Sequence, residues 1–211
     1  MKNFLIILLT GASFLANAQT EKGIFFDANL GTRIGGQTSE FATLKPGFHA
    51  EGGMGYMFSN IIGIKGHIGY STFNAVSVAN TGFNDKSSIF NATLEGVLGL
   101  SQLAGFGTEK FDLYVHAGFG FNTFSNPDYK EGYTTTSEFK DRFFKGNDDA
   151  MNVTFGLTPR FHINEKFSLN VDAAYSVIFN QSNSLDRQIG NTSLEGASGM
   201  TFVTLGMTYR L

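Results

Sequence analysis

Apolar and polar residues alternate with a period of two along most of the chain after Gln19. In Phe111–Gly120, for example, the odd positions hold Phe, Leu, Val, Ala and Phe, and the even positions hold Asp, Tyr, His and two Gly. This alternation predicts a β-strand with one apolar and one polar face. Eight such stretches occur, each near the ten-residue length of a tilted, membrane-crossing strand. They are Ile24–Gly31, Phe48–Phe58, Ile62–Tyr70, Phe90–Leu100, Phe111–Phe121, Met151–Ile163, Phe167–Val177 and Val203–Leu211.

The two faces of these stretches differ in composition. No Asp, Glu, Lys, Arg, His, Asn or Gln occupies the apolar face, and all four histidines occupy the other. That other face holds mainly Gly, Ser, Thr and Asn, whereas a face in bulk water would be rich in Lys and Glu. Small residues suit the crowded interior of an eight-stranded barrel. We therefore expect the apolar face to contact lipid. The alternative is a soluble secreted barrel or sandwich with its apolar face turned inward.

The connections between the stretches alternate in length. Short ones lie at Ser59–Asn60 and Asn164–Lys166, and a medium one at Ser101–Lys110. The long connections are Gly35–Pro46, Phe73–Ser87, Ser125–Asp149 and Asn180–Ser198. Short periplasmic turns and long external loops are typical of outer-membrane barrels. The sequence thus predicts an all-β fold, a closed antiparallel up-and-down transmembrane barrel of about eight strands.

The N-terminus has the pattern of a cleavable leader. Lys2 supplies the positive charge, Phe4–Leu15 the apolar run and Ala16-Asn17-Ala18 the small-residue cleavage site. The apolar run is shorter than the roughly 20 residues that span a bilayer. We expect residues 1–18 to be a signal peptide and residues 19–211 to be the barrel domain. The chain has no cysteine, which excludes disulfides, thiolate metal sites and a lipid-modified cysteine.

The glycine-rich alternating strand Phe111–Gly120 and the terminal strand Val203–Leu211 carry a family resemblance. The chain resembles the small outer-membrane barrels of the OmpA and OmpX type from Gly23 to Leu211. The resemblance implies a place in the bacterial outer membrane, contact with outer-membrane lipid and lipopolysaccharide, and insertion by the barrel assembly machinery. Such terminal strands usually end in Phe, whereas this one ends in Leu211. We expect the barrel alone, without the peptidoglycan-binding domain of OmpA-type proteins.

Charged and histidine side chains on the polar face fall at similar distances from the periplasmic strand ends. These are Asp27, Glu51, Lys65, His67, Glu95, His116, Arg160 and Asp172. We expect them to form one paired network that fills the lumen and fixes the register of the strands. The alternative is a gate on an ion path. The histidines have none of the short spacings that hold a metal within a strand, so no metal or cofactor is expected.

The connection Ser125–Asp149 mixes aromatic and charged residues, a combination found at binding surfaces. The candidate recognition residues are Tyr129, Tyr133, Phe139, Arg142, Phe143 and Phe144. A formal net charge of -3 without a basic block argues against nucleic acid as a partner. A serine-histidine hydrolase is the rival hypothesis from the enzymes, but His116 has no serine nearby in sequence. We expect a non-enzymatic structural or surface-interaction protein that binds an extracellular ligand through its loops. A narrow passive ion pore is the second hypothesis, and a lipid-modifying enzyme the third.

Overall fold

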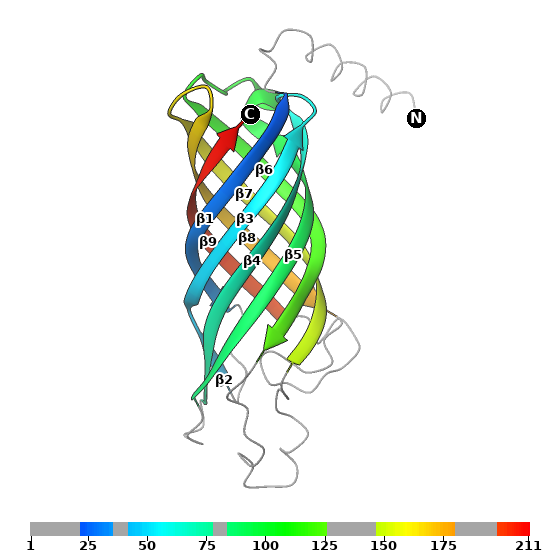
Figure 1. Cartoon of the computed structure of the whole chain (residues 1–211), viewed down its shortest axis with the longest axis vertical. Helices are drawn as coiled ribbons and strands as arrows, with labels where there is room; N and C mark the ends of the chain where they lie inside the picture. Colours follow the sequence, from blue (N-terminus) through cyan, green and yellow to red (C-terminus); the bar gives the residue numbers. More distant parts are fainter. Residues whose placement is uncertain (1–21, 36–41, 78–83, 126–146, 180–197) are drawn as a thin grey trace, which may run out of the picture.

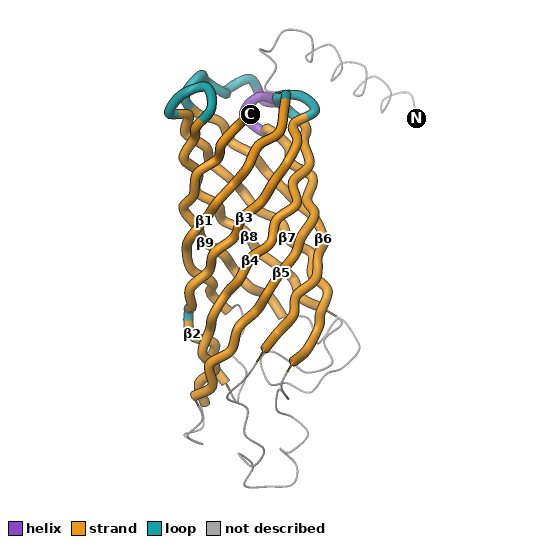
Figure 2. The backbone as a smooth tube through the Cα atoms, viewed as in Figure 1, coloured by secondary structure: helices purple, strands orange, loops and turns teal. Residues whose placement is uncertain are grey.

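The computed structural model describes residues 22–35, 42–77, 84–125, 147–179 and 198–211, which form a barrel of long tilted strands (Figures 1 and 2). The strands are β1 (Gly23–Gly35), β2 (Ala42–Lys45), β3 (Gly47–Met57), β4 (Ile62–Ser77), β5 (Asn84–Gly99), β6 (Phe111–Ser125), β7 (Asn147–His162), β8 (Phe167–Phe179) and β9 (Ser198–Arg210). A short helix, α2 (Leu100–Ala104), follows β5. Among these residues, no helix is long and apolar enough to cross a membrane.

The strands close into a single antiparallel barrel. β1 pairs with β3 and with the last strand, β9; from β3 onward each strand pairs with the next along the chain, and the pairing of β4 with β5 completes the ring. Both β2 and β3 pair with β4, and Pro46, which has no N–H to donate, separates them. Together they make one of eight barrel strands, so the predicted fold is confirmed.

The register sets the tilt of the strands. A path along successive paired residues starts at Phe25, passes through every barrel strand, and returns to β1 at Gly35, ten positions further on. Eight strands with a shear of ten residues require a tilt of about 40°. The outward apolar residues of β7 run from Met151 to Phe161. Ten steps of about 3.3 Å at this tilt cover about 25 Å, the height of the apolar band of outer-membrane barrels.

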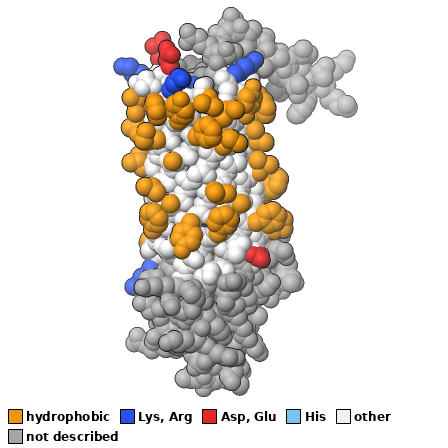
Figure 3. Space-filling model, in the orientation of Figure 1, with side chains coloured by type: hydrophobic (Ala, Val, Ile, Leu, Met, Phe, Trp, Pro, Cys, Tyr) orange, Lys and Arg blue, Asp and Glu red, His pale blue; other side chains and the backbone are white. Residues whose placement is uncertain are grey.

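Large apolar side chains cover the outside of the barrel, as the pattern predicted, and Phe119 and Leu205 are each 62% exposed. Figure 3 shows them in two bands separated by a paler zone. Aromatic side chains pair on strand ends next to the short turns: Tyr56 with Phe58, Phe111 with Phe161, and Phe167 with Tyr209. Along the strands, small outward residues alternate with the large apolar ones near the middle of each strand, namely Ala28, Gly52, Gly66, Gly96 and Ala117.

The predicted strand ends need correction. Ala42–Lys45 forms β2, β4 continues to Ser77, β5 begins at Asn84, and β7 begins at Asn147, all inside connections expected to be loops. Main-chain pairing continues there because ladder hydrogen bonds do not depend on an apolar face. The medium connection at residues 101–110 contains α2. We call the end that carries this connection and the turns at 58–61 and 163–166 the short-turn end.

Candidate functional site

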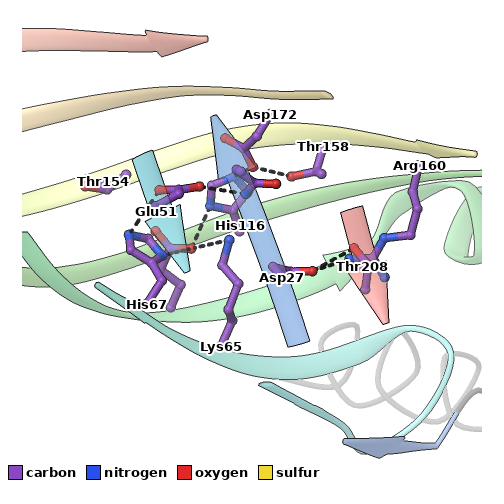
Figure 4. Close-up of polar contacts among 12 residues, drawn as sticks. Asp27, Glu51, Lys65, His67, His116, Thr154, Thr158, Arg160, Asp172 and Thr208 are labelled. Carbon is purple, nitrogen blue, oxygen red and sulfur yellow. Dashed lines mark hydrogen bonds and ion pairs between the residues drawn. The ribbon is translucent and has the colours of Figure 1, made fainter. Parts of the chain in front are cut away.

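The interior of the barrel is lined by alternate residues of every strand. Six charged or histidine residues gather near its middle, each on an inward-facing strand position (Figure 4). They are Glu51, Lys65, His67, Glu95, His116 and Asp172. We call these six residues the lumen cluster. They come from β3, β4, β5, β6 and β8, so the cluster links most of the circumference.

Glu95 is the centre of the cluster, and its side chain is fully buried. Its Oε2 atom lies 3.3 Å from Lys65 Nζ, 2.9 Å from His116 Nδ1 and 3.7 Å from His67 Nδ1. One carboxylate thus contacts three nitrogen groups. A buried carboxylate without such partners would lose the solvation that water gives it, so these contacts offset the cost of burying Glu95.

His116 connects Glu95 to a second carboxylate. Its Nε2 atom lies 3.1 Å from Asp172 Oδ2, and the same carboxylate oxygen accepts a hydrogen bond from the Thr158 hydroxyl at 2.7 Å. Both ring nitrogens of His116 thus lie within ion-pair distance of a carboxylate oxygen, so this side chain connects two acidic groups from different strands.

Glu51 forms the part of the cluster nearest the end opposite the short turns. Its Oε1 accepts a hydrogen bond from Asn29 Nδ2 at 2.8 Å, and its Oε2 lies 3.2 Å from His49 Nε2 and 3.9 Å from His67 Nε2. His49 Nδ1 in turn lies 2.6 Å from the Ser71 hydroxyl. His49 thus extends the polar contacts from β3 to β4.

Two glycines make space for the centre of the cluster. A Cβ atom at Gly118 would lie 2.6 Å from the Cα and 2.7 Å from the Cγ of Glu95. A Cβ atom at Gly156 would overlap the His116 ring, whose Cε1 would be 2.6 Å away. All three distances are far below ordinary carbon contacts, so larger residues here would displace the two side chains.

Arg160 and Asp27 lie closer to the short-turn end than the lumen cluster does, so the eight expected residues do not form one contact network. Arg160 Nη2 lies 3.9 Å from Asp27 Oδ1, and its guanidinium is 4.5 Å from the centre of the Tyr114 ring. Asp27 also accepts a hydrogen bond from the Thr208 hydroxyl at 2.6 Å. A small cavity, lined in part by both groups, separates this pair from Lys65 and His116.

Apolar layers close the interior on both sides of the polar groups. At the short-turn end, Phe25, Met57, Val97 and Tyr114 pack into a buried cluster. Inward residues towards the other end are also buried, namely Ile89, Phe124, Ala150, Ile178 and Met200. The cavities beside the lumen cluster measure about 20 and 10 Å³, enough for about one water molecule each. The alternation of residues predicts polar side chains in the interior, but not these apolar layers.

A second polar group, which the sequence analysis missed, lies at the short-turn end. His162 Nε2 lies 2.9 Å from Asp112 Oδ2, and His162 Nδ1 lies 2.8 Å from the Ser168 hydroxyl. The three residue types are those of a hydrolase triad, but the ring nitrogens are used in the reverse order, and Ser168 is buried in the interior. Asp112 also accepts hydrogen bonds from Ser101, Gln102 and Tyr114. This arrangement fits a structural link between α2 and the barrel.

Arg33 is a buried cation that the sequence analysis also missed. It is 2% exposed, none of its three guanidinium nitrogens has a hydrogen-bond partner among the described residues, and its guanidinium lies 4.8 Å from the centre of the Phe202 ring. Its inward position in β1 is readable from the alternation, but the lack of a partner is not. Among the described residues, no group of three or more histidine or acidic side chains is arranged to hold a metal ion.

The expected recognition residues between Tyr129 and Phe144 lie outside the described residues. Asp149, expected at the end of that loop, is in β7 and accepts a hydrogen bond from the Thr123 hydroxyl of β6 at 2.8 Å. The expected leader, residues 1–18, also lies outside the described part of the chain.

Comparisons with known proteins give a consistent result. The family model described as "Outer membrane protein beta-barrel domain" matches residues 4–209.

OprG from Pseudomonas aeruginosa is 15% identical, with 92% of this chain and 99% of that chain covered and a TM-score of 0.53. A major outer membrane protein from Thermus thermophilus is 12% identical, with coverages of 90% and 100% and a TM-score of 0.53. Neisserial surface protein A is 11% identical, with coverages of 90% and 97% and a TM-score of 0.51. No curated protein matches the sequence. At these identities the structural similarity shows a shared fold.

Proposed function

The chain belongs to the family of outer-membrane protein β-barrel domains, and on this basis we propose that it is a closed, non-enzymatic anchor that presents strands and loops at the cell surface for interaction. Its location is the bacterial outer membrane. The short-turn end is assigned to the periplasm, because short turns face that side in such barrels. Residues 1–18 serve as the export signal in this proposal, and β9 is the strand that the assembly machinery recognises.

The observation that carries the proposal is a strand extension at the surface end of the barrel. The outward apolar residues of β4 and β5 reach Tyr70 and Phe90, but the two strands remain paired as far as Val76 and Asn84. From Phe90 to Asn84 this extension is about 20 Å along the strand. β2 pairs with β4 alongside it. A small barrel needs no such extension to span the bilayer, and ordered strands beyond it can bind a partner through main-chain and side-chain groups.

The packed interior supports an anchor over a channel. An eight-stranded barrel is just wide enough for its own side chains, whereas aqueous channels need about sixteen strands. Here the lumen cluster and two apolar layers fill that space.

A narrow ion pore is the second candidate, and one observation favours it. The two small cavities both touch Lys65, His116 and Asp172, so these three residues separate them. If these three side chains changed conformation, the two cavities would join into one longer cavity that could hold a chain of water molecules.

Two measurements test the proposal. Binding of purified polysaccharide and intact cells is compared between the whole protein and two variants with short Asn-Gly turns, one replacing residues 74–86 and the other residues 126–146. Both variants should keep heat-resistant folding, because the transmembrane strands carry the stability, and at least one should lose binding. Equal binding by all three proteins would contradict a surface role for these segments.

Planar-bilayer recording distinguishes the anchor from the pore. The whole protein should show little steady conductance, and Arg160→Ala should increase the leak by removing the cation beside Asp27 and opening space against Tyr114. A large, stable conductance that Arg160→Ala leaves unchanged would favour the pore.

A further inference from the structure

The turn between β5 and β6 is held rigidly against the end of the barrel. Ser101 is fully buried; its hydroxyl donates to Asp112 Oδ1 at 3.0 Å and accepts from the Leu113 N–H at 2.9 Å. Gln102 Nε2 donates to the same Asp112 oxygen at 2.7 Å. These bonds attach the polar side of α2 to β6, so the opposite side of the helix must point away from the lumen.

The side of α2 that points away from the lumen is apolar. Residues two positions apart lie about 200° apart on a helix, which places Leu103 opposite Ser101. Leu103 is 52% exposed, and Phe106, just beyond the helix, is 49% exposed. A soluble turn would have the reverse polarity, with its apolar side chains packed inward and its polar ones in water.

The position of Phe106 is also fixed by the backbone. The helix ends at Gly105, which has a left-handed φ of 74° that favours glycine. The Gly105 N–H donates to the Gln102 carbonyl, and the Phe106 N–H donates to the Ser101 carbonyl at 2.9 Å. This pair of bonds is the Schellman termination, which sets the direction of the chain after a helix. The exposed phenyl ring is therefore presented by a defined structure.

Along the chain, the apolar residues of the turn follow directly on the outward-facing residues of the barrel. Leu98 and Leu100 follow the outward alternation of β5 directly into α2, and Phe111 resumes the outward surface where β6 begins. The exposed charges Glu109 and Lys110 stand between Phe106 and Phe111, as expected at the border between apolar belt and headgroups. Exposed apolar residues therefore continue from the outward face of β5 through this turn to β6, and the turns at 58–61 and 163–166 carry Phe58 and Ile163 in the same way.

We infer that Leu103 and Phe106 dock into the phospholipids of the periplasmic leaflet, at the boundary between acyl chains and headgroups, and so fix the depth of the barrel in the membrane. This inference rests on the proposed orientation of the short-turn end. Apolar side chains on an interfacial helix are buried about 5 to 10 Å into this boundary. Asp112 has a positioning role, because it binds the polar side of α2 and so directs the other side to the lipid.

The chain contains no tryptophan, so Phe106→Trp places a single fluorescent reporter at this site. The variant is reconstituted in phosphatidylcholine–phosphatidylglycerol vesicles that contain lipids brominated at either a shallow or a deep acyl position. Two matched controls are Phe119→Trp, on the exposed lipid face, and Lys110→Trp, on the charged rim. Phe106→Trp should show blue-shifted emission, quenching mainly by the shallow bromolipid, and protection from acrylamide in the water phase.

The controls make each outcome decisive. Phe119→Trp should be quenched by bromolipids and Lys110→Trp by acrylamide, which together show that the barrel is inserted. If Phe106→Trp then responds like Lys110→Trp, the residue faces water and the inference is wrong. If it is protected from both quenchers, a second copy or another protein covers it, and the inference is also wrong. Failure of Phe119→Trp to respond to bromolipids would instead contradict the membrane-barrel function itself.

Discussion

Lys65→Met tests whether the lumen cluster depends on paired charges. The substitution keeps most of the side-chain volume but removes the cation 3.3 Å from Glu95 Oε2. Two unit charges at this distance attract each other by about 5 kcal/mol at an effective dielectric constant of 20. Desolvation of the lysine offsets part of this attraction, and breaking one side of a buried pair typically costs about 3 to 5 kcal/mol. We therefore expect Lys65→Met to lower the free energy of unfolding by about 3 kcal/mol or more.

Urea unfolding in lipid vesicles, followed by the heat-modifiable gel shift, measures this change. The double variant Lys65→Met with Glu95→Gln removes both charges, so its cost should be smaller than the sum of the two single costs by about 2 kcal/mol. Lys166→Met, at an exposed position in the turn before β8, is the matched control and should change stability by less than about 0.5 kcal/mol. Additive single costs, or equal effects at Lys65 and Lys166, would refute the argument.

Three further predictions use the same unfolding assay. Gly156→Ala places a Cβ against the His116 ring and should cost about 1 to 3 kcal/mol, whereas Gly96→Ala, with only one contact at 3.8 Å, should cost less; equal costs would contradict the packing argument. Val115→Arg puts a charge on the lipid face of β6 and should cost about 2 to 4 kcal/mol, more than a polar change at inward Tyr114; equal tolerance would count against lipid contact. Arg33→Met removes a buried guanidinium that has no hydrogen-bond partner in the described part of the chain, so the variant should be at least as stable as the parent, and a large loss would show that the cation has a partner.

The alternation of residues was enough to predict which way each side chain faces. Positions that face lipid hold large apolar residues, and positions that face the narrow interior hold small or polar ones. Because successive residues of a strand face opposite sides, Phe119 and Gly120 could be assigned to opposite faces from the sequence. The depth of each residue was harder, because it depends on which residues pair across strands. Counting residues from the strand ends predicts that Arg160 lies at the depth of Lys65. The ten-residue shear of the barrel instead brings Arg160 next to Tyr114 and Asp27.

The polar group at the short-turn end was missed for a different reason. Asp112 and His162 were assigned to inward positions on separate strands, but nothing in the sequence shows that they meet across 50 residues. The connection that completes the group was taken for a loop, because a five-residue helix is too short to show a helical period. The strand extensions escaped prediction because their pairing depends on the main chain.

The seam between β1 and β9 has a consequence for the order of assembly. Asp27 and Thr208, whose side chains are hydrogen-bonded across it, are separated by 181 positions in the chain. Closing a flexible loop of this length costs about 5 kcal/mol of chain entropy, and contacts so distant in sequence form slowly. If only strands β1 to β8 had formed, the edge of β1 that pairs with β9 would be unpaired, and the interior would be open to water. A nascent chain therefore gains little from folding before β9 has been synthesised, and until then its unpaired strand edges are open to pairing with other chains.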